Sequence, residues 1–217
     1  MNYEDNIPNC KVTLVGDSGV GKSSIIGRFV AGIFSDNISS TSGLNYSQKY
    51  YEKEGKKIRL NLWDTAGQEK FRSLGRSFYK DSYIILIVYD ICNRASFENI
   101  KEIWYPEVTS NSEKIRIIAI VGNKKDKYEE EEVTDQEASS YAKEINANFF
   151  LVSANSGDGI DYMFEKLIDN YFDEEFMCKV EESKEERIDS IILNREDFKS
   201  NSISTSYNNC CWKLVIY

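Results

Sequence analysis

Histidine is missing altogether from this 217-residue chain, and only two prolines are present. The absence of histidine excludes the commonest general base, hydrolysis by a Ser-His-Asp arrangement, and every metal site that needs imidazole ligands. Long apolar runs are missing as well, since none approaches the roughly 18 residues that a membrane span requires. Any chemistry must therefore use other groups, in a chain that we expect to be soluble.

An excess of positive charge is also lacking, because 36 acidic residues outweigh 27 basic ones and leave a net charge of −9. Affinity for nucleic acid of any sequence comes from lysine and arginine that release counterions, so we do not expect a DNA or RNA partner. The polar N-terminus "MNYEDNIPN" shows no secretory signal, and the cysteines have no metal-type spacing. The five cysteines are Cys10, Cys92, Cys178, Cys210 and Cys211. These features predict a reducing, cytoplasmic setting.

Short, β-branched apolar runs alternate with amphipathic segments along most of the chain. The runs, typical of strands buried on both faces, lie at 10–16, 57–64, 84–90, 115–123 and 148–154. Apolar residues at helical spacing occur over 22–31, 94–108, 134–145 and 159–172. Thr134 and Glu137 form a capping-box start for the third of these segments. The alternation predicts an α/β fold with a mostly parallel sheet.

Two parts of the chain depart from this alternation. Residues 45–63 contain a turn at Glu54 and Gly55 and no helix, which predicts an antiparallel hairpin at the edge of a mixed sheet. After Phe176 the sequence is rich in charge, serine and asparagine, so we expect a globular domain over 1–175 and a disordered tail over 176–217. A short helix over 186–198 that docks on the core is the alternative for part of the tail.

The stretch "GDSGVGKSS" follows the first predicted strand, precedes the first predicted helix, and fits the pattern G-x-x-x-x-G-K-[ST]. Glycines let the backbone curl around an anion, and the helix N-terminus adds positive potential. In such a phosphate cradle Lys22 reaches the terminal phosphates and Ser23 ligates Mg²⁺. The predicted cradle residues are Gly16, Asp17, Ser18, Gly19, Val20, Gly21, Lys22, Ser23 and Ser24. A plain turn with a surface lysine is the alternative, and the motif alone does not distinguish ATP from GTP.

A second motif, "WDTAGQE" at 63–69, lies at the carboxyl end of a predicted strand, where open α/β sheets place their ligands. Asp64 can hold Mg²⁺ through water, and the amide of Gly67 can approach a γ-phosphate. Gln68 can orient a water for in-line attack, a catalytic role that needs no histidine. An ordinary turn at the end of a strand is the alternative for this segment.

Two further motifs, "NKKD" at 123–126 and "SAN" at 153–155, follow later strands and together select the base. The Asp126 carboxylate can accept two hydrogen bonds from guanine, whereas adenine has no matching donors and would leave the charge unpaired. Asn123 and Lys124 would frame the base, and the Ala154 amide could donate to the guanine oxygen. The residues of the last motif are Ser153, Ala154 and Asn155. Each motif alone is more typical of a solvated loop, and the four in one order at strand ends carry the argument.

With these motifs the chain resembles the Ras superfamily of small GTPases, and within it the Rab family, over about residues 8–172. "TSGLNY", "KFRSLG", "SFYKDS" and "IVYDI" are similar to the Rab-distinguishing segments. The resemblance implies a P-loop GTPase fold with a six-stranded sheet, five strands parallel and one antiparallel, and five helices. It also implies that Thr41 ligates Mg²⁺ when the γ-phosphate is present and that Phe34 packs edge-on against guanine. Tyr46, Trp63 and Phe78 would form an aromatic surface read by effectors, with ordinary core packing as the alternative.

Three departures from the family pattern bear on these expectations. Thr41 is followed by "SGLNY" in place of the usual run, which leaves the choice of effector open. Lys127 replaces a packed leucine and is followed by an acidic loop that we expect to be a solvated surface. Asn155 replaces the usual lysine, and we expect only a modest loss of affinity because the Ala154 backbone meets the base.

The tail resembles Rab proteins in its adjacent Cys210 and Cys211, which are candidates for geranylgeranylation, although six residues follow them. Prenylation would place the protein on the cytosolic face of endomembranes, with a Golgi or endosomal lean, and unmodified cysteines would leave it cytosolic. The resemblance further implies an exchange factor, a GTPase-activating protein, escort or dissociation-inhibitor proteins and effectors. We expect a monomer.

The sequence therefore predicts a switch in vesicle-mediated transport that binds GTP with Mg²⁺, hydrolyses it to GDP and changes shape between the two states. With Gln68 present and no arginine finger evident in the chain, intrinsic turnover is expected on the order of 10⁻⁴ to 10⁻² per second. An adaptor that binds guanine nucleotide without hydrolysing it is the second reading. An ATP-dependent kinase or ATPase is the third, and "NKKD" counts against it.

Overall fold

A computed structural model describes residues 7–34, 44–65, 79–111 and 114–174 of the chain. The chain divides into a first compact unit, Met1–Asp173, and a second, Glu174–Tyr217. The described residues all fall in the first unit except Glu174. The predicted tail and its alternative helix over 186–198 lie outside the described residues, so the predicted domain boundary at 175 stays a prediction.

A six-stranded mixed sheet lies at the centre of the first unit, with the strand order β2-β3-β1-β4-β5-β6. The strands are β1 (Asn9–Val15), β2 (Leu44–Lys53), β3 (Lys56–Thr65), β4 (Ile84–Asp90), β5 (Ile117–Asn123) and β6 (Asn148–Leu151). Only the β2–β3 pair is antiparallel, and every other neighbouring pair is parallel. The predicted mixed sheet with one antiparallel strand is confirmed.

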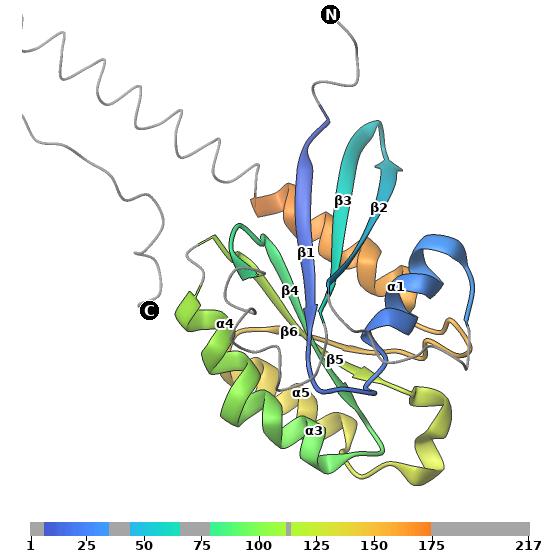
Figure 1. Cartoon of the computed structure of the whole chain (residues 1–217), viewed down its shortest axis with the longest axis vertical. Helices are drawn as coiled ribbons and strands as arrows, with labels where there is room; N and C mark the ends of the chain where they lie inside the picture. Colours follow the sequence, from blue (N-terminus) through green and yellow to red (C-terminus); the bar gives the residue numbers. More distant parts are fainter. Residues whose placement is uncertain (1–6, 35–43, 66–78, 112–113, 175–217) are drawn as a thin grey trace, which may run out of the picture. The chain divides into compact units, whose positions relative to one another are not determined.

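Helices cover both faces of this sheet, as Figure 1 shows. The described helical segments are α1 (Lys22–Ala31), α3 (Arg94–Asn99), the π-helical turn η3 (Ile100–Trp104), α4 (Tyr105–Asn111), the exposed 3₁₀ segment η4 (Lys125–Glu130), which covers neither face, α5 (Asp135–Glu144) and a helix over 160–174. The bounds of α1 are those predicted, and Thr134 caps α5 by accepting from the Glu137 amide. The interruption of the second helix by a π turn was not predicted. Among the described helices, none is both long and apolar enough to cross a membrane.

The β2–β3 hairpin turns at the two residues that the sequence indicated. Glu54 and Gly55 have φ values of 52° and 77°, and Lys53 pairs with Lys56 directly across the turn. Two successive positive φ values are those of a type I′ turn, whose twist matches that of the flanking strands. The turn therefore fixes the register that places Tyr46 opposite Trp63 further along the hairpin.

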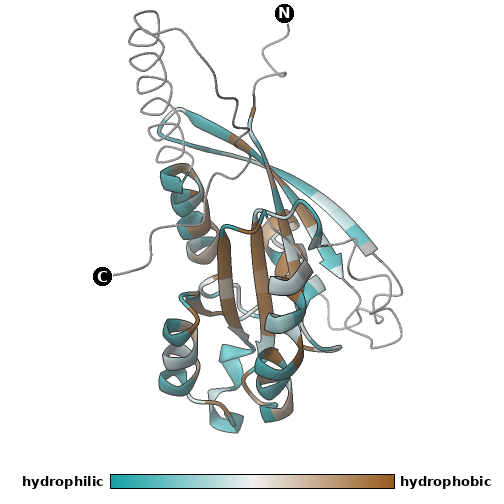
Figure 2. Cartoon of the chain, turned by 90° about the vertical axis from the view of Figure 1, so that its left-hand side faces the viewer, coloured by the Kyte–Doolittle hydropathy of each residue, from teal (hydrophilic) through white to brown (hydrophobic). Residues whose placement is uncertain are grey.

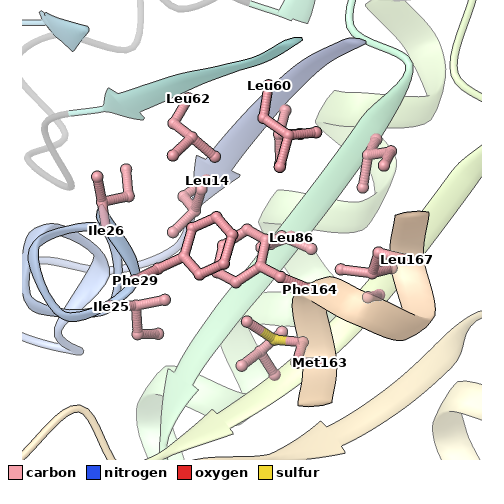
Figure 3. Packing of buried hydrophobic residues seen from close by; sticks show 14 of the residues in the cluster. Leu14, Ile25, Ile26, Phe29, Leu60, Leu62, Leu86, Met163, Phe164 and Leu167 are labelled. Atoms are coloured by element: carbon pink, nitrogen blue, oxygen red, sulfur yellow. The ribbon is translucent and has the colours of Figure 1, made fainter. Parts of the chain in front are cut away.

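Two apolar clusters, one on each face of the sheet, hold the layers together. Strand β4 is buried along its whole length and contributes alternate residues to both, Leu86 to one cluster and Ile87 to the other. On the first face, α1 meets the helix over 160–174 through stacked rings of Phe29 and Phe164, whose centroids are 3.7 Å apart (Figure 3). Figure 2 shows the brown central strands between helices that carry teal residues. The second face is covered by α3, η3, α4 and α5.

The order of the strands determines where a ligand can bind. From β1 the chain proceeds through α1 to the edge pair β2–β3 on one side, whereas β4 lies on the other side of β1. The carboxyl ends of β1, β3, β4, β5 and β6 share one edge of the sheet, because these strands are parallel. Ligands of open α/β sheets bind at such an edge, where the order reverses, and all four predicted motifs start there.

Candidate functional site

The loop between β1 and α1 is a tight curl that only glycine permits at two positions. Gly21, the N-cap of α1, has φ 98°, and a Cβ there would lie 2.2 Å from Nδ2 of Asn123. Gly16 has φ 136°, and its Cβ would lie 2.1 Å from the carbonyl oxygen of Val88. Both glycines therefore adopt a backbone conformation that residues with a side chain rarely reach. Their missing Cβ atoms also leave room for Val88 of β4 and Asn123 of β5. The result is a loop closed onto the N-terminus of a ten-residue helix.

Lys22 closes this loop from inside. Its ammonium donates to the carbonyl oxygens of Gly16, at 2.8 Å, and of Asp17, at 2.7 Å, and the residue is only 5% exposed. Burial lowers the pKa of Lys22 to about 8, although the charges of Asp64 and Asp17 oppose this shift. A cation buried at the start of a helix favours an anionic ligand, which would restore its preference for the charged form.

Ser23 and Asp64 provide adjacent oxygen atoms at the same helix start. The Ser23 hydroxyl donates to Oδ2 of Asp64 at 2.5 Å, and Asp64 is 3% exposed at the end of β3. Mg²⁺ prefers such hard oxygen ligands and takes few of them from protein, completing its shell with phosphates and water. A hydroxyl and a carboxylate therefore fit Mg²⁺, and within the described ranges no cluster of three acidic or sulfur ligands offers another metal site. Thr41, the third predicted ligand, lies outside the described residues.

The Asp126 carboxylate is held by two residues of the loop after β6. The Ser153 hydroxyl donates to Oδ1 at 2.5 Å, and Nδ2 of Asn155 donates to Oδ2 at 3.0 Å. Partial burial favours the neutral acid, but these hydrogen bonds outweigh it and hold the pKa of Asp126 below its ordinary value. The carboxylate is thus charged at neutral pH and fixed in orientation.

Asn123 links the phosphate loop to the loop after β6 and is 2% exposed. Its Nδ2 donates to the carbonyl oxygen of Val20 at 2.8 Å, and its Oδ1 accepts from the Ala154 amide at 3.0 Å. The role expected for Asn123, framing the base, is thus accompanied by a structural one. The Ala154 amide, expected to donate to a guanine oxygen, already has a partner in this structure and would share its hydrogen or exchange it.

A pocket of about 250 Å³ lies between these loops. Its lining residues are Gly19, Gly21, Ser24, Phe34, Asn123, Lys124, Asp126, Lys127, Ala154 and Asn155. The structure therefore brings three of the four predicted motifs around one cavity. Lys124 adopts φ 68° and pairs through Nζ with Oδ2 of Asp90 at 2.6 Å, which leaves its stem along the pocket. Lys127 was not assigned to the site from the sequence. Its position directly after Asp126 was the only feature of the sequence that could have indicated this place in the pocket.

Arg28 on α1 is a second residue that the sequence did not assign. Its guanidinium donates through Nε to the carbonyl oxygen of Ala154 at 2.9 Å and through a terminal nitrogen to that of Asn155 at 2.5 Å. The same guanidinium lies 5.9 Å from the ring centroid of Phe34. Arg28 thus supports both the loop after β6 around Ser153–Asn155, here called the base loop, and the aromatic residue expected to contact guanine. No local pattern distinguishes this arginine from a surface charge on an amphipathic helix.

Of the remaining residues predicted to have a function, the structure describes only Tyr46 and Trp63. Tyr46 is 51% exposed, and its ring centroid lies 5.1 Å from that of the half-buried Trp63. Core packing alone does not account for so exposed a tyrosine, and the role of the pair as an effector surface stays a prediction. The predicted residues outside the described ranges are Thr41, Gly67, Gln68, Phe78, Cys210 and Cys211.

A family model described as the Ras family matches residues 11–173. The chain is 38% identical to the Ras-related protein Rab-26 of Bos taurus over 158 residues, 72% of this chain and 61% of that protein. It thus spans less than two thirds of the Rab-26 length. It is 35% identical to the Ras-related protein SEC4 of Saccharomyces cerevisiae over 204 residues, 93% of this chain and 90% of that protein. With the Ras-related protein RabC of Dictyostelium discoideum it shares 37% identity over 160 residues, 73% of this chain and 81% of that protein. The chain therefore belongs to the Ras family and, within it, to the Rab group of small GTPases.

Proposed function

We propose that the chain binds GTP and GDP with Mg²⁺, hydrolyses GTP, and acts as a nucleotide-dependent switch in vesicle-mediated transport. The observation that carries this proposal is a pocket lined both by the fixed Asp126 carboxylate and by Gly19 and Gly21 of the loop that precedes the buried Lys22. The pocket thus combines an acceptor for the base with glycines of the proposed phosphate cradle. A purine nucleotide that contacts both would lie at the carboxyl edge of the sheet.

Phosphate binding follows from the geometry of the loop and the start of α1. The amide groups of the loop and of the first helical turn are those that an α-helix leaves without internal acceptors, and they favour an anion. Lys22, which now donates to two loop carbonyls, would turn its charge toward the phosphates. Ser23 and Asp64 would hold Mg²⁺, which neutralises phosphate charge when bound.

Base selection depends on the charge of Asp126. Each carboxylate oxygen has room for more than one hydrogen bond, so Oδ1 and Oδ2 can keep Ser153 and Asn155 while accepting from guanine. Hydrogen bonds to a charged group are worth about 1.5–3 kcal/mol each, and adenine would forfeit both. GTP is therefore expected to bind orders of magnitude more tightly than ATP.

Hydrolysis is proposed to rely on Gln68, which would orient a water, and on the amide of Gly67 near the γ-phosphate. Because the sequence motifs include no evident arginine finger, a GTPase-activating protein would supply the missing charge, and unassisted turnover would be slow. Thr41 and the Gly67–Gln68 segment would be the parts whose arrangement depends on the γ-phosphate.

Transport partners and location are proposed from membership of the Rab group. They comprise an exchange factor, escort or dissociation-inhibitor proteins, effectors that read Tyr46, Trp63 and Phe78, and attachment to endomembranes through geranylgeranyl groups on Cys210 and Cys211. Mass spectrometry of protein from its native cell tests the last point, because an unmodified pair of cysteines would reject the anchor.

The binding proposal is tested by displacing labelled GDP from the purified, Mg²⁺-loaded chain. Unlabelled GTP should compete at equimolar concentration, whereas ATP should fail at a hundredfold excess. Effective displacement by ATP would overturn the assignment of Asp126 as the guanine acceptor. Single-turnover hydrolysis by wild type and Gln68→Leu then tests catalysis, since equal rates would leave the second reading, a non-hydrolysing adaptor.

A further inference from the structure

Asp17, the second residue of the phosphate loop, carries a negative charge in a segment that we propose binds phosphate. Both oxygens of its carboxylate accept hydrogen bonds from the helix on the opposite face of the sheet. Nδ2 of Asn99 donates to Oδ2 at 2.6 Å, and Nε1 of Trp104 donates to Oδ1 at 2.8 Å. The carboxylate is therefore held against the α3–η3 helix, and Asp17 does not line the nucleotide pocket.

The π turn is what allows both donors to reach one carboxylate. Asn99 and Trp104 are five residues apart, and residues at that spacing lie about 140° apart around a regular α-helix. In η3 the Tyr105 amide donates to the carbonyl of Ile100, so the turn closes over five residues and not four. Residues five apart then lie on one face of the helix. The widened turn thus places the amide of Asn99 and the indole of Trp104 side by side.

Asp17 also contacts Lys22, through its backbone carbonyl. The Asp17 carbonyl is one of the two oxygens that receive the Lys22 ammonium, at 2.7 Å. Fixing the Asp17 side chain from the helix therefore also fixes the carbonyl that locates the buried cation. Trp104 is 4% exposed and packed in the second apolar cluster, so its indole is a rigid anchor for this purpose.

We propose that Asn99 and Trp104 are positioning residues for nucleotide binding, which hold the Asp17 carboxylate away from the phosphates and preset the loop around Lys22. This inference rests on the proposed function. A released carboxylate could turn toward the triphosphate, where two like charges at close range repel strongly in a partly buried site. Two neutral N–H donors prevent this without adding charge to the loop.

The test measures the dissociation rate of a fluorescent GDP analogue from the full, Mg²⁺-loaded chain. Trp104→Phe keeps an aromatic ring in the core but removes the indole donor together with part of the ring system, whereas Asn99→Ala removes the amide donor at a half-buried position. Each variant should release GDP about tenfold faster, because a hydrogen bond to a charged group is lost. Glu102→Ala, an exposed position in the same turn, is the matched control and should leave the rate unchanged.

A purely structural role is separated by repeating both changes in an Asp17→Ala background. If the two donors act through the Asp17 carboxylate, Trp104→Phe and Asn99→Ala should have no further effect there. An equal acceleration in both backgrounds, or wild-type release rates in the single variants, would overturn the inference. Should Trp104→Phe prove unfolded by circular dichroism, Asn99→Ala decides the question alone. Failure of the wild-type chain to bind guanine nucleotide would instead reject the proposed function.

Discussion

At the scale of single residues, the site depends on polar side chains that each serve two loops. Asn123 joins the phosphate loop to the base loop, and Asp126 is held by the hydroxyl of Ser153 and the amide of Asn155. Buried polar groups that are fully hydrogen-bonded define one arrangement, because any other leaves a costly unsatisfied partner. Asp126, the proposed base acceptor, is therefore held in one orientation by the protein itself.

Replacing the Asp126 carboxylate by an amide should change the preferred base from guanine to xanthine. Asp126→Asn presents an amide in place of a carboxylate, and we expect GDP affinity to fall by at least about a hundredfold, since hydrogen bonds to a charged group are lost. Xanthosine diphosphate carries an oxygen where guanine carries its exocyclic amine, so its affinity should rise. Titration calorimetry with both nucleotides measures the exchange.

Asp158→Asn is the matched control for this substitution. Asp158 pairs with Lys125 at 2.7 Å on the surface and does not line the pocket. Its replacement should leave both affinities within about twofold of wild type, as exposed ion pairs contribute little. Unchanged GDP affinity in Asp126→Asn would show that the base is recognised elsewhere.

At the scale of elements, the helix from Arg94 to Asn111 contains a π turn, and this turn contacts the phosphate loop. Its π turn follows Asn99 and is followed by Pro106, a residue that lacks an amide hydrogen and crowds the preceding turn of a regular helix. π turns are rare and are frequently found at functional sites. Here the turn faces the phosphate loop through Trp104.

Deleting Glu102 should convert this turn into regular α-helix. Asn99 and the tryptophan would then lie four residues apart, a spacing that also shares one helix face, so both should still reach Asp17. We expect GDP release to remain within about twofold of wild type and the melting temperature to stay equal or rise, because α-helical hydrogen bonds replace π ones. Release as fast as in Trp104→Phe would contradict the geometry derived for η3.

The elements differ in how far the sequence determines them. The bounds of α1 and the turn at Glu54 and Gly55 could be predicted because each depends on local chemistry, the apolar period in one case and a glycine suited to positive φ between two strand-like runs in the other. The π turn could not, because nothing in "IKEIW" departs from a helical pattern. It shows in the backbone, where the Tyr105 amide donates to the carbonyl of Ile100, and its use shows in the contact of Trp104 with Asp17, 87 positions away.

The same distinction separates the site residues that were predicted from those that were missed. Motif spacing identified most of the pocket residues, though not Phe34 or Lys127, because each motif begins at a strand end and parallel strands gather those ends at one edge. Arg28 and Asn99 were missed because their partners lie in other loops, 126 and 82 positions away. Contacts of that kind follow from tertiary packing and carry no local signature.

At the scale of the whole described unit, the site joins the loops that follow β1, β5 and β6 to the carboxyl end of β3 and the start of α1. These parts meet through side-chain contacts such as Ser23 with Asp64 and Asn123 with Ala154. Further away, Lys53 at the hairpin tip pairs with Glu165 at 2.7 Å and Asp169 at 3.0 Å on the last described helix. A ligand that bridges the loops should therefore stabilise the unit as a whole.

Nucleotide should accordingly raise the melting temperature of the protein. With free GDP and Mg²⁺ at a hundred times the dissociation constant, linkage gives about 2.7 kcal/mol of added stability, or about 5–10 °C for a domain of this size. Chelation of Mg²⁺ should reduce the shift, because Ser23 and Asp64 lose the ion that they would hold, and ATP should produce none. Differential scanning fluorimetry of nucleotide-free protein measures all three, and an equal shift with ATP would contradict base selection by Asp126.

The indole that donates to Asp17 also makes the phosphate loop optically visible. Trp104 is shielded from solvent and donates a hydrogen bond to Asp17 in the loop that a nucleotide would contact. Its fluorescence emission should therefore change when a nucleotide binds. In a variant with Trp63 and Trp212 replaced by phenylalanine, the remaining signal would report loading and release continuously, without a labelled nucleotide. The chain thus contains a built-in reporter beside its proposed phosphate-binding loop.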